Sequence, residues 1–221
     1  MKIRMEEGLG DICRGLLFGF AVYEHVTIRP PDDELTARIQ ALQGHLRAHH
    51  TLENFKNLKG VDNARGIFKK LGIDPSRYRP SHEALIRRSL QGKDIFFLNT
   101  GVDVNNLLSL QYQLAMGLYN LDAIEGELTF RTGMAGEYYA ALNGRDVETD
   151  NKLILSDEKG PFGSPYVDST RTKIDAHVQH VLHVVYFADN SLRDEHWVEM
   201  ARTIKAYLGG TGGIYQIIET K

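Results

Sequence analysis

The chain has 221 residues, 42% of them hydrophobic and 25% charged, so it can bury a substantial core and its composition excludes a disordered protein. The formal net charge of -3 and the pI near 6.3 argue against non-specific coating of nucleic acid, because such binding neutralises many phosphates with Lys and Arg. The single cysteine, Cys13, cannot form an internal disulfide, and the apolar run 15–22 is too short to cross a bilayer, so we expect a cytoplasmic protein without a targeting peptide or a membrane partner.

The first half of the chain predicts one buried strand followed by helices. The apolar run 15–22, GLLFGFAV, is bounded by charged residues and is typical of a strand inside a sheet. Asp32 and Asp33 mark the start of a helix, because acidic residues favour the N-terminal turn, and apolar residues follow at helical spacing. The helical stretches predicted in this half are 35–48, 62–71 and 81–92, the last one capped by Ser81.

The segment 101–126 predicts a helix that leads into a turn and then a strand. Asp103 stands at an N-cap position, with Val104, Leu107 and Leu108 at helical spacing behind it. Gly117 interrupts the pattern, and a residue without a Cβ leaves room for a ligand to approach the backbone. The segment is therefore either a buried helix with its connection or one wall of a binding site.

The second half of the chain predicts mainly strands. Alternating or continuous apolar residues indicate strands, and Asn143-Gly144 indicates a hairpin turn. A helix capped by Ser191 carries an apolar stripe that includes Trp197 and Ile204, and it ends at Gly209. Helices in the first half and strands in the second favour an α+β fold over alternating βαβ units. The predicted strands are 127–131, 137–141, 152–155, 180–188 and 214–218.

The histidines do not predict a metal site. His45 and His49 stand four residues apart, as metal ligands on a helix do, but no third ligand is evident near them. In an extended run, His180 would point away from His177 and His183. The run GGTGG at 209–213 follows a helix and precedes a strand, which is the wrong order for a phosphate-binding loop. We therefore expect neither a metal nor a cofactor.

A basic cluster lies between two predicted helices and along the second of them. One interpretation is a solvated helix face, because runs of charge commonly serve solubility. The other is contact with an RNA phosphate backbone, for which the forked donors of arginine are suited. The residues are Arg77, Arg79, Arg87, Arg88 and Lys93.

Two stretches carry a resemblance to a known family. VDVNNLLSLQYQLAMGLYNLDAIEGELTFR and EYYAALNGRDVETDNKLILSDEKGP are similar to the B3/B4 domain of the phenylalanyl-tRNA synthetase β chain. The resemblance covers roughly 79–188, and it implies an α+β fold with a mixed, β-sandwich-like core of unusual topology flanked by helices. We expect one domain over 1–221, with an N-terminal strand and helices (1–78), the matching core (79–188), and a C-terminal helix and closing strand (189–221).

The resemblance also implies a pocket, which in the synthetase hydrolyses tyrosine wrongly attached to the phenylalanine tRNA. The family's polar Thr-Asn pair falls on Asn105 and Asn106, of which Asn106 matches. The pocket histidine of the family falls on Gly117, and its later glutamate falls on or near Val184. Two groups that would orient water or recognise a tyrosyl hydroxyl are therefore replaced in this chain.

The segment DSTRTKI, 168–174, is similar to DSERTKI of free-standing members of the family. Its hydroxyls and guanidinium suit a carboxylate, a phosphate or a terminal ribose, and the alternative is a capped turn with an exposed arginine. Tyr119 and other tyrosines either wall an aromatic slot or belong to the core. The donors are Ser169, Thr170, Arg171 and Thr172.

Two functions follow from these patterns. The first is binding of tRNA, at its aminoacylated 3′ end, with hydrolysis of mischarged aminoacyl-tRNA in trans. In that reaction the amides around Gly117 and the donors of 169–172 would hold the carbonyl and a water without a covalent nucleophile. The second is a non-catalytic module that binds a free amino-acid-like ligand or a protein partner. Neither function calls for DNA.

Overall fold

A buried strand, β2 (Leu17–Glu24), lies inside the first of two sheets. It pairs antiparallel with β10 (Thr211–Glu219) and with β9 (Val181–Ala188), and β9 pairs antiparallel with β3 (Met116–Asn120). The strand order is β10-β2-β9-β3. All residues of β9 are buried, as its continuous apolar run predicts, because a strand covered on both faces needs apolar side chains throughout. The computed structural model describes residues 2–220.

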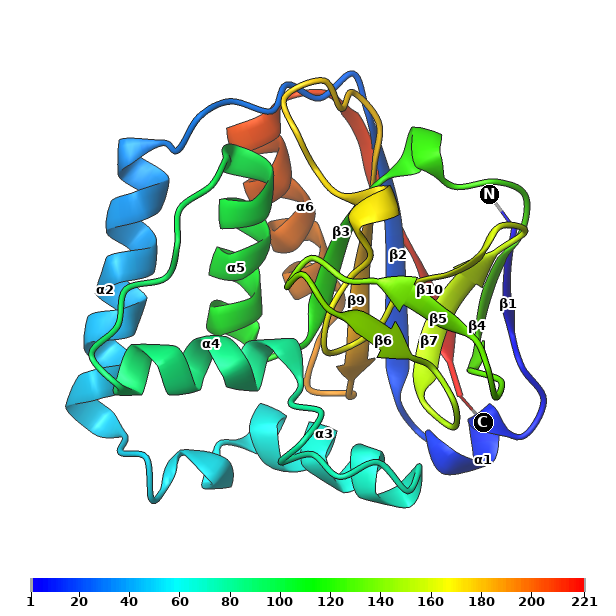
Figure 1. Ribbon diagram of the computed structural model, residues 1–221. Coiled ribbons are helices and arrows are strands. Elements are labelled where there is room, and N and C mark those ends of the chain that lie inside the picture. The colour runs from blue at the N-terminus through cyan, green and yellow to red at the C-terminus, as the bar shows by residue number, and fades with distance from the viewer. Residues whose placement is uncertain (1, 221) are drawn as a thin grey trace.

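The second sheet faces the first and closes a sandwich (Figure 1). Its order is β1-β4-β7-β8, with β1 parallel to β4 and the other pairs antiparallel. Phe18 of the first sheet and Phe130 of the second are in contact, with ring centroids 4.7 Å apart. The strands are β1 (Ile3–Met5), β4 (Leu128–Thr132), β7 (Leu153–Asp157) and β8 (Gly160–Gly163), with a separate hairpin of β5 (Tyr138–Ala140) and β6 (Asp146–Glu148).

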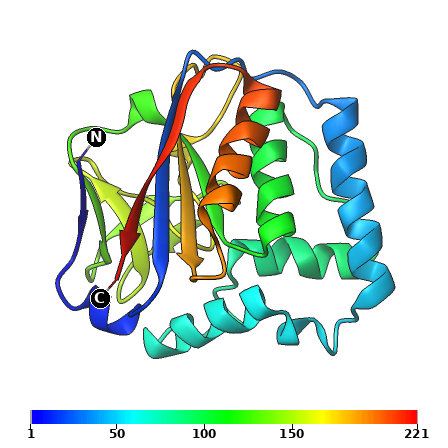
Figure 2. The same ribbon diagram turned by 180° about the vertical axis from the view of Figure 1, so that it is seen from behind.

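Helices α2, α4, α5 and α6 lie on the other side of the first sheet, as both ribbon views show (Figures 1 and 2), whereas Leu9 of α1 and Phe68 of α3 join the core between the sheets. Apolar residues of α5 and α6, such as Leu107 and Ile204, share one core with Val185 of β9. No helix within residues 2–220 is long and apolar enough to cross a membrane. The helices are α1 (Leu9–Ile12), α2 (Asp33–His49), α3 (Lys59–Lys70), α4 (Ser81–Leu90), α5 (Thr100–Tyr112) and α6 (Asp194–Leu208), with 3-10 turns η1 (Phe55–Asn57), η2 (Leu121–Ala123) and η3 (Thr170–Thr172).

The order of layers is therefore sheet, sheet, helices, which confirms the α+β class and the sandwich-like core. The predicted strands at 15–22, 127–131, 137–141, 152–155, 180–188 and 214–218 all form, and β1, β3, β6 and β8 are additional. The first sheet takes β2, β9 and β10 from the three segments 1–78, 79–188 and 189–221 respectively. The division of the chain at 78 and 188 stays a prediction.

The prediction for 101–126 was wrong in two details. Helix α5 begins at Thr100, and its N-cap is Asn99, whose side chain accepts a hydrogen bond from the Val102 amide at 2.9 Å. Asp103 is instead a buried residue of the first turn. The helix ends before Gln113, which has φ 54°, and Gly117 lies inside strand β3 rather than in a turn.

The predicted caps of two other helices also differ. Ser81 is the first residue of α4, after the N-cap Pro80. Ser191 does not cap α6, because its hydroxyl bonds Asp189, and the N-cap is Arg193. In each case a residue type that favours caps lies within two residues of the actual cap, and for Ser191 the nearer Asp189 takes the hydroxyl.

Candidate functional site

The positions that correspond to the family pocket lie between the two sheets. Gly117 and Val184 are directly paired across β3 and β9, and both are on the face that meets the second sheet. The two positions onto which the resemblance maps the family's pocket histidine and glutamate are therefore neighbours in the fold. The space between the sheets at this point is filled by Tyr119, which follows Gly117 by two residues on the same face of β3.

The ring of Tyr119 fits because two glycines face it. A Cβ added to Gly117 would lie 2.2 Å from the Tyr119 hydroxyl oxygen, and one added to Gly163 of β8 would lie 2.5 Å from it. The ring also meets Phe162 edge-on, with centroids 5.2 Å apart. Gly117 therefore admits a side chain of the protein itself.

A hydrogen-bonded network surrounds the Tyr119 hydroxyl. It donates to Asp168 Oδ1 at 2.7 Å and lies 2.7 Å from the Tyr186 hydroxyl. Burial raises the pKa of Asp168 to about 7, although the hydrogen bond from Tyr119 opposes the shift. Burial also raises the pKa of both tyrosines above their usual value. Near neutral pH this interior therefore contains a carboxyl group that titrates between neutral and charged forms.

Asn105 and Asn106 lie on α5, on the helical side of the first sheet. Asn105 Nδ2 donates to the Met116 carbonyl at 3.3 Å, so this residue contacts β3 next to Gly117. Its Oδ1 is buried and has no partner among the described residues. Asn106 is half-buried. The Asn105 amide therefore supports β3 from the side opposite to Tyr119.

The segment 169–172 forms a capped turn. Ser169 Oγ accepts a hydrogen bond from the Arg171 amide at 3.1 Å, and Thr170 Oγ1 donates to the Ala140 carbonyl. Thr172 is fully buried. The hydroxyls of Ser169 and Thr170 are thus used within the fold.

The guanidinium of Arg171 is held by the protein on several sides. Both of its terminal nitrogens bond the carboxylate of Asp157, each at 2.9 Å, and they also reach the carbonyls of Ala123 and Gly160. Burial of Asp157 raises its pKa, but the bonds from Arg171 and from backbone amides outweigh burial and hold the pKa of this carboxyl below its usual value. Arg171 therefore ties η3 to the second sheet.

The basic cluster divides into two groups. Arg88 donates to the Asp94 carbonyl at 2.6 Å and stacks on Phe96, whose ring is 69% exposed. Arg87 and Lys93 lie on the same helix or just beyond it. Arg77 and Arg79, in contrast, belong to the loop before α4 and line a cleft.

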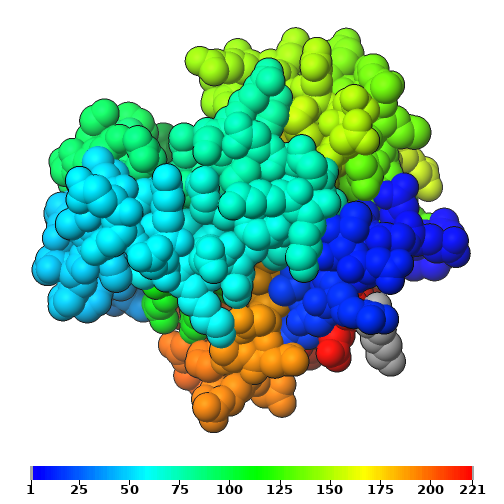
Figure 3. Space-filling model, turned by 90° about the horizontal axis from the view of Figure 1, so that it is seen from below, coloured from blue at the N-terminus to red at the C-terminus, as the bar shows by residue number. Residues whose placement is uncertain are grey.

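This cleft has a volume of about 570 Å³ and lies between the loop and the β5–β6 hairpin, next to Tyr166. Figure 3 shows this side of the molecule, where the cyan-green residues around 75 meet the yellow-green residues of the second sheet and its hairpin. Arg145, at the hairpin turn, supplies a third guanidinium. We call it the arginine cleft; its walls also hold Tyr78, Asn143, Asp146, Val147, Glu148 and Val167.

Two cationic groups lie near the ring of Tyr78 in the arginine cleft. The Cζ atom of Arg77 lies 5.3 Å from the centroid of the Tyr78 ring, and Lys152 Nζ lies 4.4 Å from the same centroid. Tyr166 is a neighbour, with ring centroids 5.8 Å apart. Arg79 is held by the Ser76 carbonyl at 2.9 Å.

The sequence did not single out Arg145, Tyr78 or Lys152. Asn143-Gly144 correctly indicated the hairpin turn, so Arg145 could be placed at its tip. That this tip lies beside the loop of Arg77 and Arg79 depends on tertiary packing and could not be predicted.

The histidines are dispersed in the structure. The rings of His45 and His49 lie 4.1 Å apart, and His180 pairs with Asp122 at 3.0 Å. His183 is buried beside Tyr215, and burial lowers its pKa to about 3. Within residues 2–220 no three His, Cys, Asp or Glu side chains are grouped as a metal site.

Comparison with known proteins finds similar sequences in the β subunit of phenylalanine–tRNA ligase. The β subunit of phenylalanine–tRNA ligase from Fusobacterium nucleatum subsp. nucleatum is 27% identical over 99 residues, which are 43% of this chain and 12% of that protein. The same subunit from Neisseria gonorrhoeae is 32% identical over 76 residues, 34% of this chain and 10% of that protein. The matched region is thus a small part of each relative.

A solved structure shows a similar fold along nearly the whole chain. It is an N-terminal fragment of the phenylalanyl-tRNA synthetase β subunit from Pyrococcus horikoshii, with a TM-score of 0.50 and 14% identity over 98% of this chain and 53% of that one. The family model named B3/4 domain matches residues 63–205, which include β3, β9 and the arginine cleft. Because that match covers more than half of the sequence, the chain belongs to the B3/4 domain family.

Proposed function

We propose that this protein binds the 3′ end of tRNA in the arginine cleft and does so in the cytoplasm. The observation that carries the proposal is the convergence of Arg77, Arg79 and Arg145 on a cleft in which the ring of Tyr78 lies near two cationic groups. Relatives named phenylalanine–tRNA ligase make tRNA the first nucleic acid to consider.

The chemistry of the arginine cleft suits a single-stranded RNA end. Guanidinium groups bind phosphates through paired N–H donors. Unstacked bases bind to aromatic rings, and Tyr78 and Tyr166 are both partly exposed in the cleft. A volume of about 570 Å³ is within the range that holds one small ligand or the end of a longer one.

Hydrolysis of mischarged aminoacyl-tRNA has less support than binding. Tyr119 fills the space beside Gly117, and Val184 has no polar group to orient water. Arg171, a predicted donor, is occupied by Asp157. We therefore propose a protein that binds tRNA without the tyrosine-specific reaction, and the remaining predicted donors, Ser169, Thr170 and Thr172, stay proposals as contacts to the aminoacyl group.

A titration of fluorescent tRNA at two salt concentrations tests the proposal. Binding must weaken as salt rises, because phosphate contacts release counterions. Arg77→Ala and Arg145→Ala should each weaken binding and reduce the salt slope by about one. Tyr78→Ala should cost about 1–3 kcal/mol, which is the contribution of one stacked base. Shortened tRNA that lacks the unpaired 3′ nucleotides should bind poorly to the wild-type protein and to each variant.

Two variants serve as controls. Arg47→Ala removes an exposed arginine of α2 outside the cleft and should leave affinity unchanged. Arg88→Ala tests the other half of the basic cluster, and an effect equal to that of Arg77→Ala would show that RNA follows α4 instead. Salt-independent binding, or no binding of tRNA at all, would exclude the proposal. Incubation with a panel of mischarged tRNAs should release amino acid no faster than buffer does.

A second function is favoured by the mixed charge of the arginine cleft. Asp146 and Glu148 lie in it together with the arginines, so the cleft offers partners for both the ammonium and the carboxylate of a free amino acid. Calorimetric titration with individual amino acids in the absence of tRNA distinguishes this function. Saturable amino-acid binding, lost in Arg145→Ala and without any tRNA binding, would favour it.

A further inference from the structure

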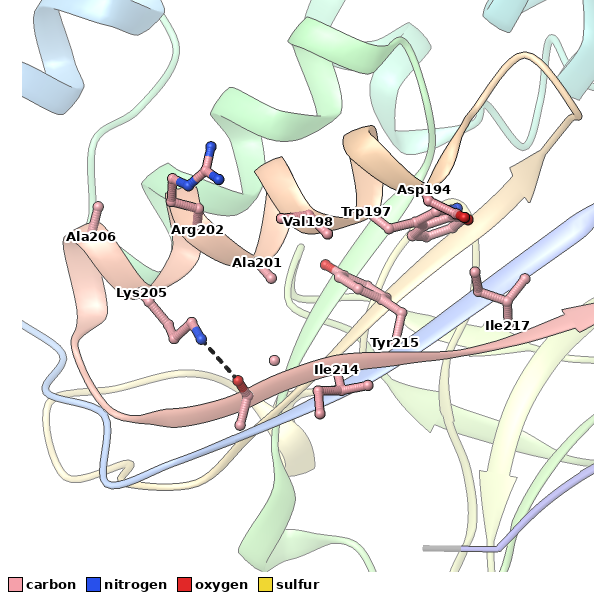
Figure 4. Close-up of a pocket in the computed structure, with 12 residues that line it drawn as sticks. Asp194, Trp197, Val198, Ala201, Arg202, Lys205, Ala206, Ile214, Tyr215 and Ile217 are labelled. Atoms are coloured by element: carbon pink, nitrogen blue, oxygen red, sulfur yellow. Dashed lines mark hydrogen bonds between the residues drawn. The ribbon is translucent and has the colours of Figure 1, made fainter.

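A separate apolar groove lies between α6 and β10. It has a volume of about 710 Å³, and Figure 4 shows Trp197, Val198 and Ala201 of the helix opposite Tyr215 and Ile217 of the strand. Trp197 and Tyr215 form its floor, with ring centroids 4.9 Å apart. Helix α6 and strand β10 lie towards the viewer in Figure 2, whereas the β5–β6 hairpin, which lines the arginine cleft, lies towards the viewer in Figure 1.

The strand along this groove is an edge strand. In the order β10-β2-β9-β3, β10 runs for nine residues, and within residues 2–220 it pairs only with β2. Ile214 is 88% exposed, Ile217 40%, and Val198 on the facing helix 56%. Natural edges of this length are commonly protected by charge, proline or a covering element, and Glu219 is the only charged residue of β10. This edge therefore has the properties of a strand that another chain covers.

The charges along the groove differ at its two ends. Arg202 and Lys205 lie at the end where β10 begins, and Lys205 Nζ donates to the Gly212 carbonyl at 3.1 Å. Asp194 lies at the other end of α6, towards Ile217 (Figure 4), and Glu219 ends the strand. If β10 of a second copy paired antiparallel with this strand, the acidic end of each copy would lie against the basic end of the other.

We propose that β10 is the dimerisation edge of this protein and that its occupant is β10 of a second copy. A two-fold axis perpendicular to the sheet pairs the two strands antiparallel and joins the two four-stranded sheets into one of eight strands. The same axis places Lys205 and Arg202 of each copy opposite Asp194 and Glu219 of the other. Ile214, Ile217 and Val198 become covered in the same step.

Sedimentation equilibrium of the full chain tests this assembly. The wild-type protein should be a dimer at micromolar concentration, and Ile214→Lys should raise the dissociation constant by about tenfold or more, because it places a charge in the centre of the interface. Leu98→Lys is the matched control, since Leu98 is 64% exposed outside the groove, and it should leave the dimer intact. A wild-type protein that stays monomeric at high concentration overturns the proposal, as does a dimer that Ile214→Lys leaves unchanged.

Exchange of charge tests the two-fold arrangement itself. Lys205→Glu brings like charges together at both ends of the seam, and Asp194→Lys does the same with the opposite sign, so each variant alone should dissociate. A mixture of the two variants should form a heterodimer, because the introduced glutamate then meets the introduced lysine at one end and Asp194 meets Lys205 at the other. Circular dichroism of each variant verifies that α6 is intact. If folded variants do not associate in the mixture although each is monomeric alone, the antiparallel arrangement is wrong.

Discussion

The hydroxyl oxygen of Tyr119 lies 2.2 Å from the point that a Cβ on Gly117 would occupy. The glycine and the tyrosine are therefore a matched pair, in which the missing side chain of one residue makes room for the other. The interior between the sheets is closed at this point by the protein's own ring, and the consequence can be measured as stability.

We expect Gly117→Ala to destabilise the protein by about 1–3 kcal/mol, the usual cost of overpacking a closed interior. Tyr119→Leu removes the atoms that the new methyl group meets, so the same substitution should cost less in that background. Gly44→Ala in α2 is the control. A Cβ there meets no atom within 4 Å, and alanine in a helix should be neutral or stabilising. Urea denaturation of Gly117→Ala, Tyr119→Leu, the double variant and Gly44→Ala measures the free energy of unfolding of each. If the losses from Gly117→Ala and Tyr119→Leu simply add in the double variant, the two residues are not a matched pair.

Arg171 should be a structural residue rather than a ligand contact. Arg171→Met leaves the fully buried carboxylate of Asp157 without its main partner, and breaking such a pair costs about 3–5 kcal/mol. Asp157→Asn removes the charge and should recover part of this loss when combined with Arg171→Met. A stable Arg171→Met protein that has lost tRNA affinity would instead support the prediction from the sequence that this arginine contacts the ligand.

Most elements of the fold could be predicted from the sequence because they depend on local patterns, whereas the sandwich was implied by the family resemblance. The continuous apolar run of β9 and the period of α2 both act over a few residues. The occupancy of the pocket could not be predicted in this way. Whether Gly117 opens onto a ligand depends on Tyr119 folding back over it, and on Gly163, 46 positions away in the chain, leaving space from the opposite sheet.

The bonding of the polar loop was also beyond the sequence. DSTRTKI supplies donors by composition, but whether Arg171 is available depends on Asp157 of β7 and on the carbonyls of Ala123 and Gly160. In the arginine cleft the sequence supplied two of the three arginines, because they are close together in the chain. It missed Arg145, which reaches the cleft through the packing of a hairpin.

Asn99 and Asp103 provide a test of the corrected helix start. Asn99→Ala removes the acceptor of the Val102 amide and should cost about 1 kcal/mol, the usual contribution of an N-cap. Asp103→Asn keeps an acceptor for the Leu98 amide and removes a carboxyl whose pKa is raised to about 6 by burial. That variant should be as stable as the wild type or more stable at pH 8. Thermal denaturation of both distinguishes the two positions, and a larger loss in Asp103→Asn would favour Asp103 as the cap.

Asp168 should make stability decrease as the pH rises towards neutrality. Its pKa in the folded protein is raised to about 7 by burial, whereas that of an unfolded aspartate is about 4. Between these values the folded state holds a proton that the unfolded state has released, so raising the pH favours unfolding, and above about 7 the effect is constant. Asp168→Asn keeps the acceptor for Tyr119 and removes the titration.

The difference in unfolding free energy between Asp168→Asn and the wild type should therefore grow in favour of the variant from pH 5 to pH 7. Its slope is bounded by about 1.4 kcal/mol per pH unit, the value for one proton. The other titrating carboxyl with a raised pKa, Asp103, is common to both proteins and cancels in the difference. Tyr119→Phe removes the hydrogen bond that opposes the shift, so the pKa of Asp168 should rise further and the window of pH dependence should extend above 7. Parallel stability curves for Asp168→Asn and the wild type would show that the carboxyl of Asp168 is solvated in the folded protein and that the network around Tyr119 is open to water.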